Sequence, residues 1–323
     1  MGELDPEFTE RVTALLDLIE QGLADAAVAR TDFVTEAAQH IISAGGKRFR
    51  PLLVVLAALL GEDADDTAII NAALVMELTH VASLYHDDVM DEAQLRRGAP
   101  SANQRWDNTV AILVGDFLFA RASLLVAGLG TEYVKLQAET FGRLVQGQIA
   151  ETRGPLEADD PLTHYLGVVS DKTGSLIAAS AVFGGMVAGL SAPELEALGA
   201  YGEAIGVVFQ LSDDIIDIAS DTSGKTPGTD LRAGVPTLPT LLVRRSGDPA
   251  DARLLALLDA DLSADADLAE ALDLMRAHPA MSEARDEINR RAETARAHLA
   301  PLPDGPAKAA LAALCDGVIS RSS

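Results

Sequence analysis

The stretch Asp87-Asp88-Val89-Met90-Asp91 interrupts an otherwise apolar helical sequence, and its pattern returns as Asp213-Asp214-Ile215-Ile216-Asp217. In each copy the first and last Asp are four residues apart, about 40° of rotation on an α-helix, so their carboxylates share a face. Such carboxylates repel each other, and partial burial raises that cost unless a counter-charge is present. Mg²⁺ is a suitable counter-charge because it prefers oxygen ligands and accepts water or phosphate beside one or two carboxylates. One copy alone is weak evidence, because a solvated acidic helix face can carry the same pattern, whereas two copies flanked by apolar residues predict a metal site.

The apolar period is helical along the chain, beginning with Phe8, Val12, Leu15, Leu16 and Ile19. Glycine and proline separate the later segments, and the alternation typical of strands is not sustained. Helices are predicted at 25–43, 51–60, 66–93, 102–128, 131–152, 162–170, 174–190, 194–220, 236–246, 250–260, 265–277, 280–299 and 305–320. No linker-like segment precedes the more polar tail after Gly247, so we predict one all-α domain over residues 1–323. The helices 66–93 and 194–220, which carry the two Asp motifs, are expected at its centre.

Length, charge and cysteine content limit the class of protein. The chain has 323 residues, 48% of them hydrophobic, and a net charge of −24, which argues against nucleic acid and anionic membranes as partners. Cys315 is the only cysteine, and the acidic N-terminus lacks the pattern of a signal peptide, so a reducing cytoplasm is expected. The uncharged segment from Thr173 to Pro193 is long enough to span a bilayer, but it is built largely from Gly, Ala and Ser. We interpret it as a buried helix and predict no membrane span.

Several cations interrupt this acidic chain in Gly-rich or apolar settings. In Gly45-Gly46-Lys47-Arg48-Phe49-Arg50-Pro51 the glycines let backbone approach an anion, which Lys47 and Arg50 then hold. The spacing is not that of a P-loop. Taken alone, this segment also fits an ordinary basic turn, Arg96-Arg97-Gly98 a solvated helix cap, and His80 a core histidine. Further polar candidates near the motifs are Lys172, Thr173, Gln210 and Lys225.

Together these residues describe a cavity with two rows of carboxylates and several cations. That combination suits a Mg²⁺-bound diphosphate with a second anion nearby. No Ser-His-Asp, Cys-His or His-Glu metal pattern stands out, which favours a reaction without a protein nucleophile, in which cations stabilise a departing diphosphate.

In this order the segments resemble the trans-isoprenyl diphosphate synthases, or polyprenyl synthetase family. The resemblance covers residues 45 to 239 and includes both Asp motifs. Its other parts are Gly45 to Pro51, Glu77-Leu78-Thr79-His80, Arg96-Arg97-Gly98, Gly115-Asp116-x-Leu118, Lys172-Thr173, Phe209-Gln210, Gly224-Lys225 and Thr237-Leu238-Pro239.

The resemblance implies an all-α homodimer of the isoprenoid synthase type with a deep central cleft between the motif-bearing helices. It implies head-to-tail condensation of isopentenyl diphosphate with an allylic diphosphate, using three Mg²⁺ ions. Asp87 and Asp91 would bind two ions and Asp213 a third, with Asp88, Asp214 and Asp217 holding metal-bound water or nearby cations; we include Asp217 among the metal ligands. The allylic diphosphate would meet Arg96, Lys172, Thr173, Gln210 and Lys225. Isopentenyl diphosphate would meet Gly46, Lys47, Arg50, His80 and Arg97.

One position departs from the family pattern. Many members carry Lys after the Gly of the Asp-Leu-x-x-Gly segment, whereas Val235 follows Gly234 here. One cation expected near the allylic diphosphate is therefore absent from that position, and Arg232 is a candidate replacement.

Product length is argued from the helix before the first motif. An allylic tail starting near Asp87 runs back past Ser83, Ala82 and Thr79, which are small, toward Met76, about 16 Å away. This predicts a long-chain product, with Phe117 or Phe119 as alternative floors. The alternatives are a short-chain farnesyl or geranylgeranyl diphosphate synthase, a catalytic subunit that needs a helper, and a terpene cyclase. In a cyclase the isopentenyl-binding cations would be idle.

Overall fold

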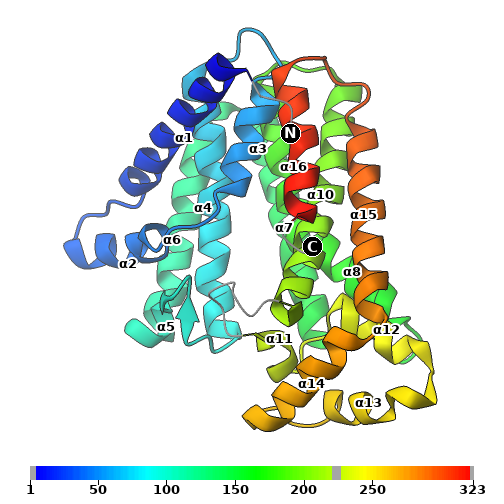
Figure 1. Ribbon diagram of the computed structural model, residues 1–323. Coiled ribbons are helices and arrows are strands. Elements are labelled where there is room, and N and C mark those ends of the chain that lie inside the picture. The colour runs from blue at the N-terminus through cyan, green and yellow to red at the C-terminus, as the bar shows by residue number, and fades with distance from the viewer. Residues whose placement is uncertain (1–4, 220–226, 321–323) are drawn as a thin grey trace. The chain divides into compact units, whose positions relative to one another are not determined.

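The computed structural model describes residues 5–219 and 227–320, and nearly all regular structure in these ranges is helical. The prediction of an all-α fold is confirmed (Figure 1). Packing divides the chain into two compact units. The first comprises Met1–Gly142, Leu176–Gly202 and Pro301–Leu311, and the second Arg143–Ser175, Glu203–Ala300 and Ala312–Ser323. That residues 1–323 act as a single domain stays a prediction.

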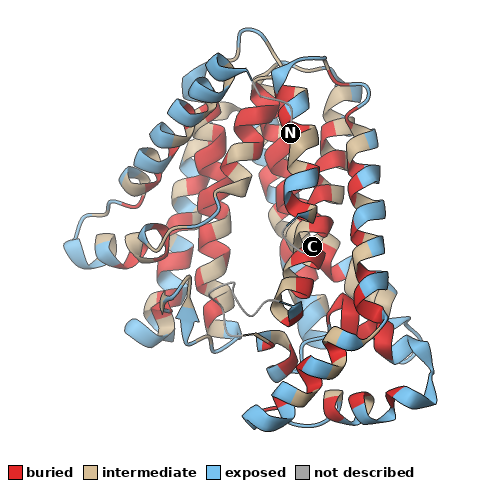
Figure 2. Cartoon of the chain, in the orientation of Figure 1, coloured by how far each residue is buried: buried red, intermediate tan, exposed pale blue. Residues whose placement is uncertain are grey.

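The first unit is built around one long helix, α4 (Asp66–Met90), which packs against α1 (Pro6–Ala26), α3 (Phe49–Ala58) and α6 (Asn108–Leu129). Residues of α4 are buried along most of its length, as Figure 2 shows, because its apolar residues cover more than one face. From the N-terminal part of the chain this unit also contains α2 (Asp32–Ser43), β1 (Leu95–Arg96), β2 (Ala99–Pro100), α5 (Ala102–Arg105) and the first half of α7 (Thr131–Arg153).

Helix α9 (Ser175–Val187) lies almost wholly in the first unit and is packed closely against α3. A Cβ atom on Gly184 would lie 2.3 Å from the carbonyl oxygen of Val54, so only glycine permits this approach. Phe183 and Leu176 are fully buried. The uncharged segment is thus a buried helix over much of its length, as expected.

The second unit carries the second Asp motif on α10 (Ala192–Ala219), a helix that begins in the first unit. Its other elements are α8 (Pro161–Val169), a π-helical turn η1 (Ser170–Gly174), α11 (Thr229–Arg232), α12 (Leu238–Ser246), the 3₁₀ turn η2 (Pro249–Asp251), α13 (Ala252–Leu258), α14 (Asp265–Ala277) and α15 (Ala280–His298). The last helix, α16 (Pro306–Ile319), has residues in both units.

Two of the predicted helices are wrong because each contains an N-cap. The predicted helix 25–43 is divided: α1 runs on to Ala26, and α2 starts after Thr31, whose hydroxyl accepts from the N–H of Val34. The predicted helix 102–128 is likewise divided, since Asp107 accepts from the N–H of Val110 and starts α6. In each case one capping side chain was enough to start a new helix.

The segment Arg96-Arg97-Gly98 forms a hairpin turn and not a helix cap. Leu95 pairs with Pro100 and Arg96 with Ala99, which leaves Arg97 and Gly98 as a two-residue loop with φ of 54° and 79°. Positive φ at both loop positions is the geometry of a tight hairpin whose twist matches its strands. The hairpin places Arg96 and Arg97 shortly after the first motif, between α4 and α5.

Three helices in residues 5–219 and 227–320 are long and apolar enough to cross a membrane by length and composition alone: Asp66–Met90, Asn108–Leu129 and Pro161–Val187. Their most apolar windows are 67%, 33% and 56% buried, respectively. Burial within the protein accounts for much of the apolar surface of the first and third, whereas only a third of the most apolar window of α6 is buried.

Candidate active site

The first Asp motif lies at the C-terminal end of α4, with Asp91 as the C-cap residue. Asp88 is fully buried, and Arg96 donates to its Oδ1 from Nε at 2.7 Å and from Nη2 at 2.6 Å. Burial raises the pKa of Asp88, and the neighbouring Arg96 opposes that shift. Asp87 is instead partly exposed, and Asp91 is exposed. The motif therefore separates into one buried, paired carboxylate and two accessible ones.

The end of α4 concentrates negative charge. The helix macrodipole places partial negative charge at a C-terminus, which adds to the field of three neighbouring carboxylates. Within the described residues, Asp88 Oδ2 is buried and has no hydrogen-bond partner. This arrangement favours a cation at Asp87 and Asp91.

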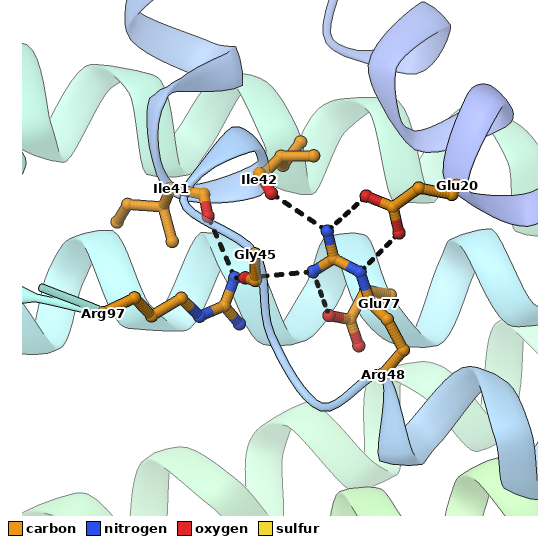
Figure 3. A network of polar contacts seen from close by, with 7 residues as sticks. All are labelled: Glu20, Ile41, Ile42, Gly45, Arg48, Glu77 and Arg97. Carbon is orange, nitrogen blue, oxygen red and sulfur yellow. Dashed lines mark hydrogen bonds and ion pairs between the residues drawn. The ribbon is translucent and has the colours of Figure 1, made fainter. Parts of the chain in front are cut away.

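The basic loop before α3 is held by Arg48 and Arg97 (Figure 3). Arg97 donates to the carbonyl oxygens of Ile41, at 2.9 Å, and Gly45. Its guanidinium lies against Gly46, where a Cβ atom would be 2.9 Å from Cζ. The glycine at position 46 therefore allows Arg97 to pack on the loop.

Arg50 and His80 lie beside Arg97 in a region of excess positive charge. Burial lowers the pKa of Arg50 to about 10, with a further contribution from Arg97 and an opposing one from Glu77. Burial, followed by Arg50 and Arg97, holds the pKa of His80 well below its usual value, so this histidine is neutral at pH 7. Arg50 Nε is buried and has no hydrogen-bond partner in the described part of the chain. An anion bound here would accept a hydrogen bond from Arg50 and reduce the repulsion between Arg50 and Arg97.

The second Asp motif, on α10, has a different arrangement. Asp214 is buried and accepts from Tyr165 Oη, from Gln210 Nε2 at 3.2 Å and from the backbone N–H of Leu238 at 3.2 Å. Burial raises its pKa to about 7 despite these three donors. Asp217 accepts from the backbone N–H groups of residues 229 and 230, at 3.1 and 3.0 Å, and so caps the start of α11. Asp213 is partly exposed.

Lys172 and Thr173 lie in the π-helical turn η1, a feature often found at functional sites. Lys172 forms an ion pair with Glu151 on α7, and Thr173 Oγ1 donates to Gln210 Oε1 at 3.4 Å. A Cβ atom on Gly147 would lie 2.7 Å from the backbone nitrogen of Lys172, so glycine lets α7 lie directly against the turn.

Arg143 on α7 binds the same turn. Its guanidinium donates to Asp171 Oδ1 at 2.6 Å, Ser170 Oγ at 2.8 Å and Glu203 Oε1 at 2.7 Å. Sequence reasoning missed Arg143, Glu203 and Tyr165 because nothing in their local sequence marks them. Their partners are 27 to 60 positions away in the chain.

The predicted site residues thus fall into two groups, one in each compact unit. Asp87, Asp88 and Asp91 share the first unit with Gly46, Lys47, Arg50, His80, Arg96 and Arg97, and Asp213, Asp214 and Asp217 share the second with Lys172, Thr173 and Gln210. Lys225 lies outside the described residues. Arg232 does not replace the lysine missing at Val235 in this structure, because it donates to Ser263 O at 2.8 Å and Asp265 Oδ1 at 2.6 Å. That the two groups face each other across a cleft stays a prediction.

An all-α chain with two Asp-Asp-x-x-Asp motifs on long helices, and a cluster of cations beside the first, has the features of an isoprenoid synthase fold. Residues 31–275 match the family model described as Polyprenyl synthetase, which covers more than two thirds of the chain. The chain belongs to the polyprenyl synthetase family.

Named relatives and solved structures agree with this assignment. The chain is 51% identical over 320 residues to a nonaprenyl diphosphate synthase of Mycobacterium tuberculosis, covering 98% of this chain and 95% of the relative. It is 33% identical to octaprenyl diphosphate synthase of Escherichia coli, covering 89% and 90%. A geranylgeranyl pyrophosphate synthase of Corynebacterium glutamicum, solved with calcium and isoprenyl diphosphate, superimposes with a TM-score of 0.89 at 44% identity, covering 99% and 98%.

Proposed function

We propose that this chain is a prenyltransferase that condenses isopentenyl diphosphate head-to-tail with an allylic diphosphate, in a Mg²⁺-dependent reaction. The product is a long-chain all-trans polyprenyl diphosphate. The observation that carries the proposal is the half-buried cluster of Arg50, Arg97 and His80, with an unpaired donor on Arg50, on the same unit as the accessible Asp87 and Asp91. One group suits a diphosphate bound directly by cations, and the other a diphosphate bound through metal. The similarity to nonaprenyl and octaprenyl diphosphate synthases supports the long-chain product.

The residues available fit divalent metal only together with a substrate. Among residues 5–219 and 227–320, no three His, Cys, Asp or Glu side chains converge as a metal site. Mg²⁺ is commonly bound by one or two carboxylates and completed by phosphate and water, which is what Asp87 and Asp91 offer. Asp213 is the corresponding accessible carboxylate on α10. Asp217 is less suited, because its two oxygens already accept from the start of α11. Bound Mg²⁺ would neutralise charge on the allylic diphosphate.

The protein groups then act mainly by binding and orientation. Lys172, Thr173, Gln210 and Arg96 are assigned to the allylic diphosphate, and Lys47, Arg50, Arg97 and neutral His80 to isopentenyl diphosphate, with Gly46 allowing close approach. The allylic C–O bond breaks, and the electrons remain on the departing diphosphate. The isopentenyl double bond attacks the allylic cation, and a proton then leaves to the diphosphate. Cations aligned with the departing charge lower the barrier without a protein nucleophile.

The product is expected to extend along α4. Ala82, Thr79 and Met76 are all buried. Thr79 Oγ1 accepts from Gln137 Nε2 on α7 at 3.1 Å, which adds Gln137 to the side chains that shape this region. Ala82→Phe or Ser83→Phe is expected to shorten the product. Unchanged length in both variants would reject the tunnel along α4.

The experiment that tests the function uses the purified chain alone with Mg²⁺, isopentenyl diphosphate and farnesyl diphosphate, and reads product length by mass spectrometry. Products several units longer than farnesyl are expected, and excess chelator should abolish them. Products that end at farnesyl or geranylgeranyl would identify a short-chain enzyme. Turnover only after a second subunit is added would identify a helper-dependent one, and a cyclic hydrocarbon would identify a cyclase.

A further inference from the structure

Arg48 stands in the sequence between Lys47 and Arg50, two of the cations assigned to isopentenyl diphosphate. Its guanidinium, however, is already fully hydrogen-bonded to the protein (Figure 3). Nε and Nη2 donate to the two carboxylate oxygens of Glu20 at 2.6 and 2.7 Å, and Nη2 also donates to Ile42 O at 2.9 Å. Nη1 donates to Glu77 Oε1 at 3.1 Å and, at 3.5 Å, to Gly45 O. An arginine has five N–H groups, so none is left for a phosphate.

The backbone that these bonds hold is unusual. Arg48 has φ of 46° at the N-cap of α3, and Gly45 and Gly46 have φ of 89° and 155°. A non-glycine residue in the left-handed region is strained and persists only where its surroundings hold it. Here α1 contributes Glu20, α4 contributes Glu77 and α2 contributes the Ile42 carbonyl, so three helices hold one turn.

Glu77 is the buried carboxylate among these cations. It is 2% exposed, and it stabilises the charged forms of Arg48, Arg50 and Arg97. Arg48 and Arg97 both donate to the carbonyl oxygen of Gly45, which brings two guanidinium groups onto one acceptor. Without Glu77 the repulsion among these cations would not be compensated, and the loop would lose the hydrogen bond from Arg48 to α4.

We infer that Glu77, Arg48 and Glu20 form a buckle that positions the isopentenyl diphosphate loop, in which Arg48 is a positioning residue and not a ligand. The buckle sets the backbone of residues 45–48 and keeps Lys47, Arg50 and Arg97 close enough to share one diphosphate. This inference rests on the proposed function and adds to it the residues that organise one of its two substrate sites.

The test compares Glu77→Gln, Glu20→Gln and Arg48→Gln with the unaltered chain. Isopentenyl diphosphate is varied at saturating allylic diphosphate, and then the reverse. Glu77→Gln and Arg48→Gln are expected to raise the KM for isopentenyl diphosphate about tenfold or more, since each removes a hydrogen bond between charged groups. Glu20→Gln should have a smaller effect because the Glu20 side chain is 51% exposed. The KM for the allylic diphosphate should change less than about twofold in all three.

Asp66→Asn is the matched control, because it breaks the Arg11–Asp66 pair, which also joins α1 to α4 but lies on the surface. Its KM values should equal those of the unaltered chain. Equal rises in both KM values, or an unchanged KM for isopentenyl diphosphate in Glu77→Gln and Arg48→Gln, would overturn the buckle.

Calorimetry with isopentenyl diphosphate alone separates this inference from the proposed function. An unaltered chain that binds isopentenyl diphosphate but does not condense it, with weaker binding in Glu77→Gln, would keep the buckle and remove the proposed reaction. If the unaltered chain condenses both substrates and Glu77→Gln binds isopentenyl diphosphate equally well, the proposed reaction stands and the buckle is overturned. No binding by the unaltered chain would overturn both.

Discussion

At the scale of single residues, Arg96 is expected to matter for stability as well as for the substrate. Arg96→Gln would leave the buried carboxylate of Asp88 without its ion pair, which costs about 3 kcal/mol of unfolding free energy in buried pairs. Urea denaturation would measure the change. The double variant Arg96→Gln/Asp88→Asn should recover much of the lost unfolding free energy, because no unpaired charge is then buried. Arg245→Gln, which breaks the exposed pair with Glu283, is the control and should cost less than about 1 kcal/mol.

Cys315 offers a second test at this scale. The thiol is fully buried, and burial raises its pKa to about 11. Because the thiolate is the reactive form, we expect almost no labelling by a thiol reagent at pH 8 in the folded protein. In denaturant one thiol per chain should react at once. Rapid labelling without denaturant would show that the environment of α16 is more open than described.

At the scale of helices, Gly115 sets the packing of α6 against α4. A Cβ atom there would lie 2.4 Å from His86 Nε2 and 3.1 Å from the carbonyl oxygen of Ala82. Gly115→Ala should therefore destabilise the protein by about 1–3 kcal/mol through overpacking. Gly128→Ala is a matched control on the same helix, because nothing lies within 4 Å of its Cβ position. That substitution should be neutral or stabilise by up to about 1 kcal/mol through helix propensity. Equal effects of both variants in urea denaturation would contradict this packing.

The π-helical turn η1 leads to a prediction about pH. Arg143 lowers the pKa of Glu203 by hydrogen bonding and charge. A carboxylate whose pKa is lower in the folded state stabilises the fold above its unfolded pKa, near 4.5, and that stabilisation is lost as pH falls through the folded pKa. Glu203→Gln should therefore lower the melting temperature at pH 7, whereas the difference should shrink as the pH falls below 4.5 and through the lowered pKa of Glu203. Glu283→Gln, from the exposed pair with Arg245, should show little effect at either pH. A difference that persists in acid would mean that packing, and not charge, is responsible.

Most helices were predictable from the sequence, because a long apolar period such as that of residues 66–93 has only one regular interpretation. The breaks before Asp32 and Asn108 were missed because each depends on a single capping side chain. In the candidate site, the side chains that could bind metal or diphosphate were predictable from the sequence. Several of the residues that hydrogen-bond to them were not. Nothing near Asp214 in the sequence indicates Tyr165, and nothing near Asp217 indicates that its carboxylate caps α11. Contacts between distant segments determine these roles, and no local pattern records them.

At the scale of the whole molecule, α6 has an apolar face that residues 5–219 and 227–320 do not cover. Ile112, Leu113 and Leu124 are 43%, 61% and 68% exposed, and its most apolar window has a mean hydropathy of 2.0. A shallow hollow of about 490 Å³ follows the same helix, lined mainly by apolar atoms of Phe119, Ala120, Leu124 and Ala127. Exposed apolar surface of this kind marks an interaction site, and we propose that a second copy of the chain covers it, as the family resemblance implies.

The proposed dimer can be tested by its mass and by one substitution on α6. Sedimentation should give about twice the chain mass of 33.8 kDa, and Leu124→Glu should shift the protein toward monomer, because a buried charge without a partner opposes association. Leu18→Glu, on the 47% exposed Leu18 of α1, is the control and should leave the dimer intact. Binding of the unaltered chain to neutral lipid vesicles, with loss of that binding in Leu124→Glu, would show instead that α6 meets a membrane. An unaltered chain that is monomeric and does not bind vesicles would contradict the proposal. The apolar face of α6 would then stay in water, which is unfavourable for apolar surface.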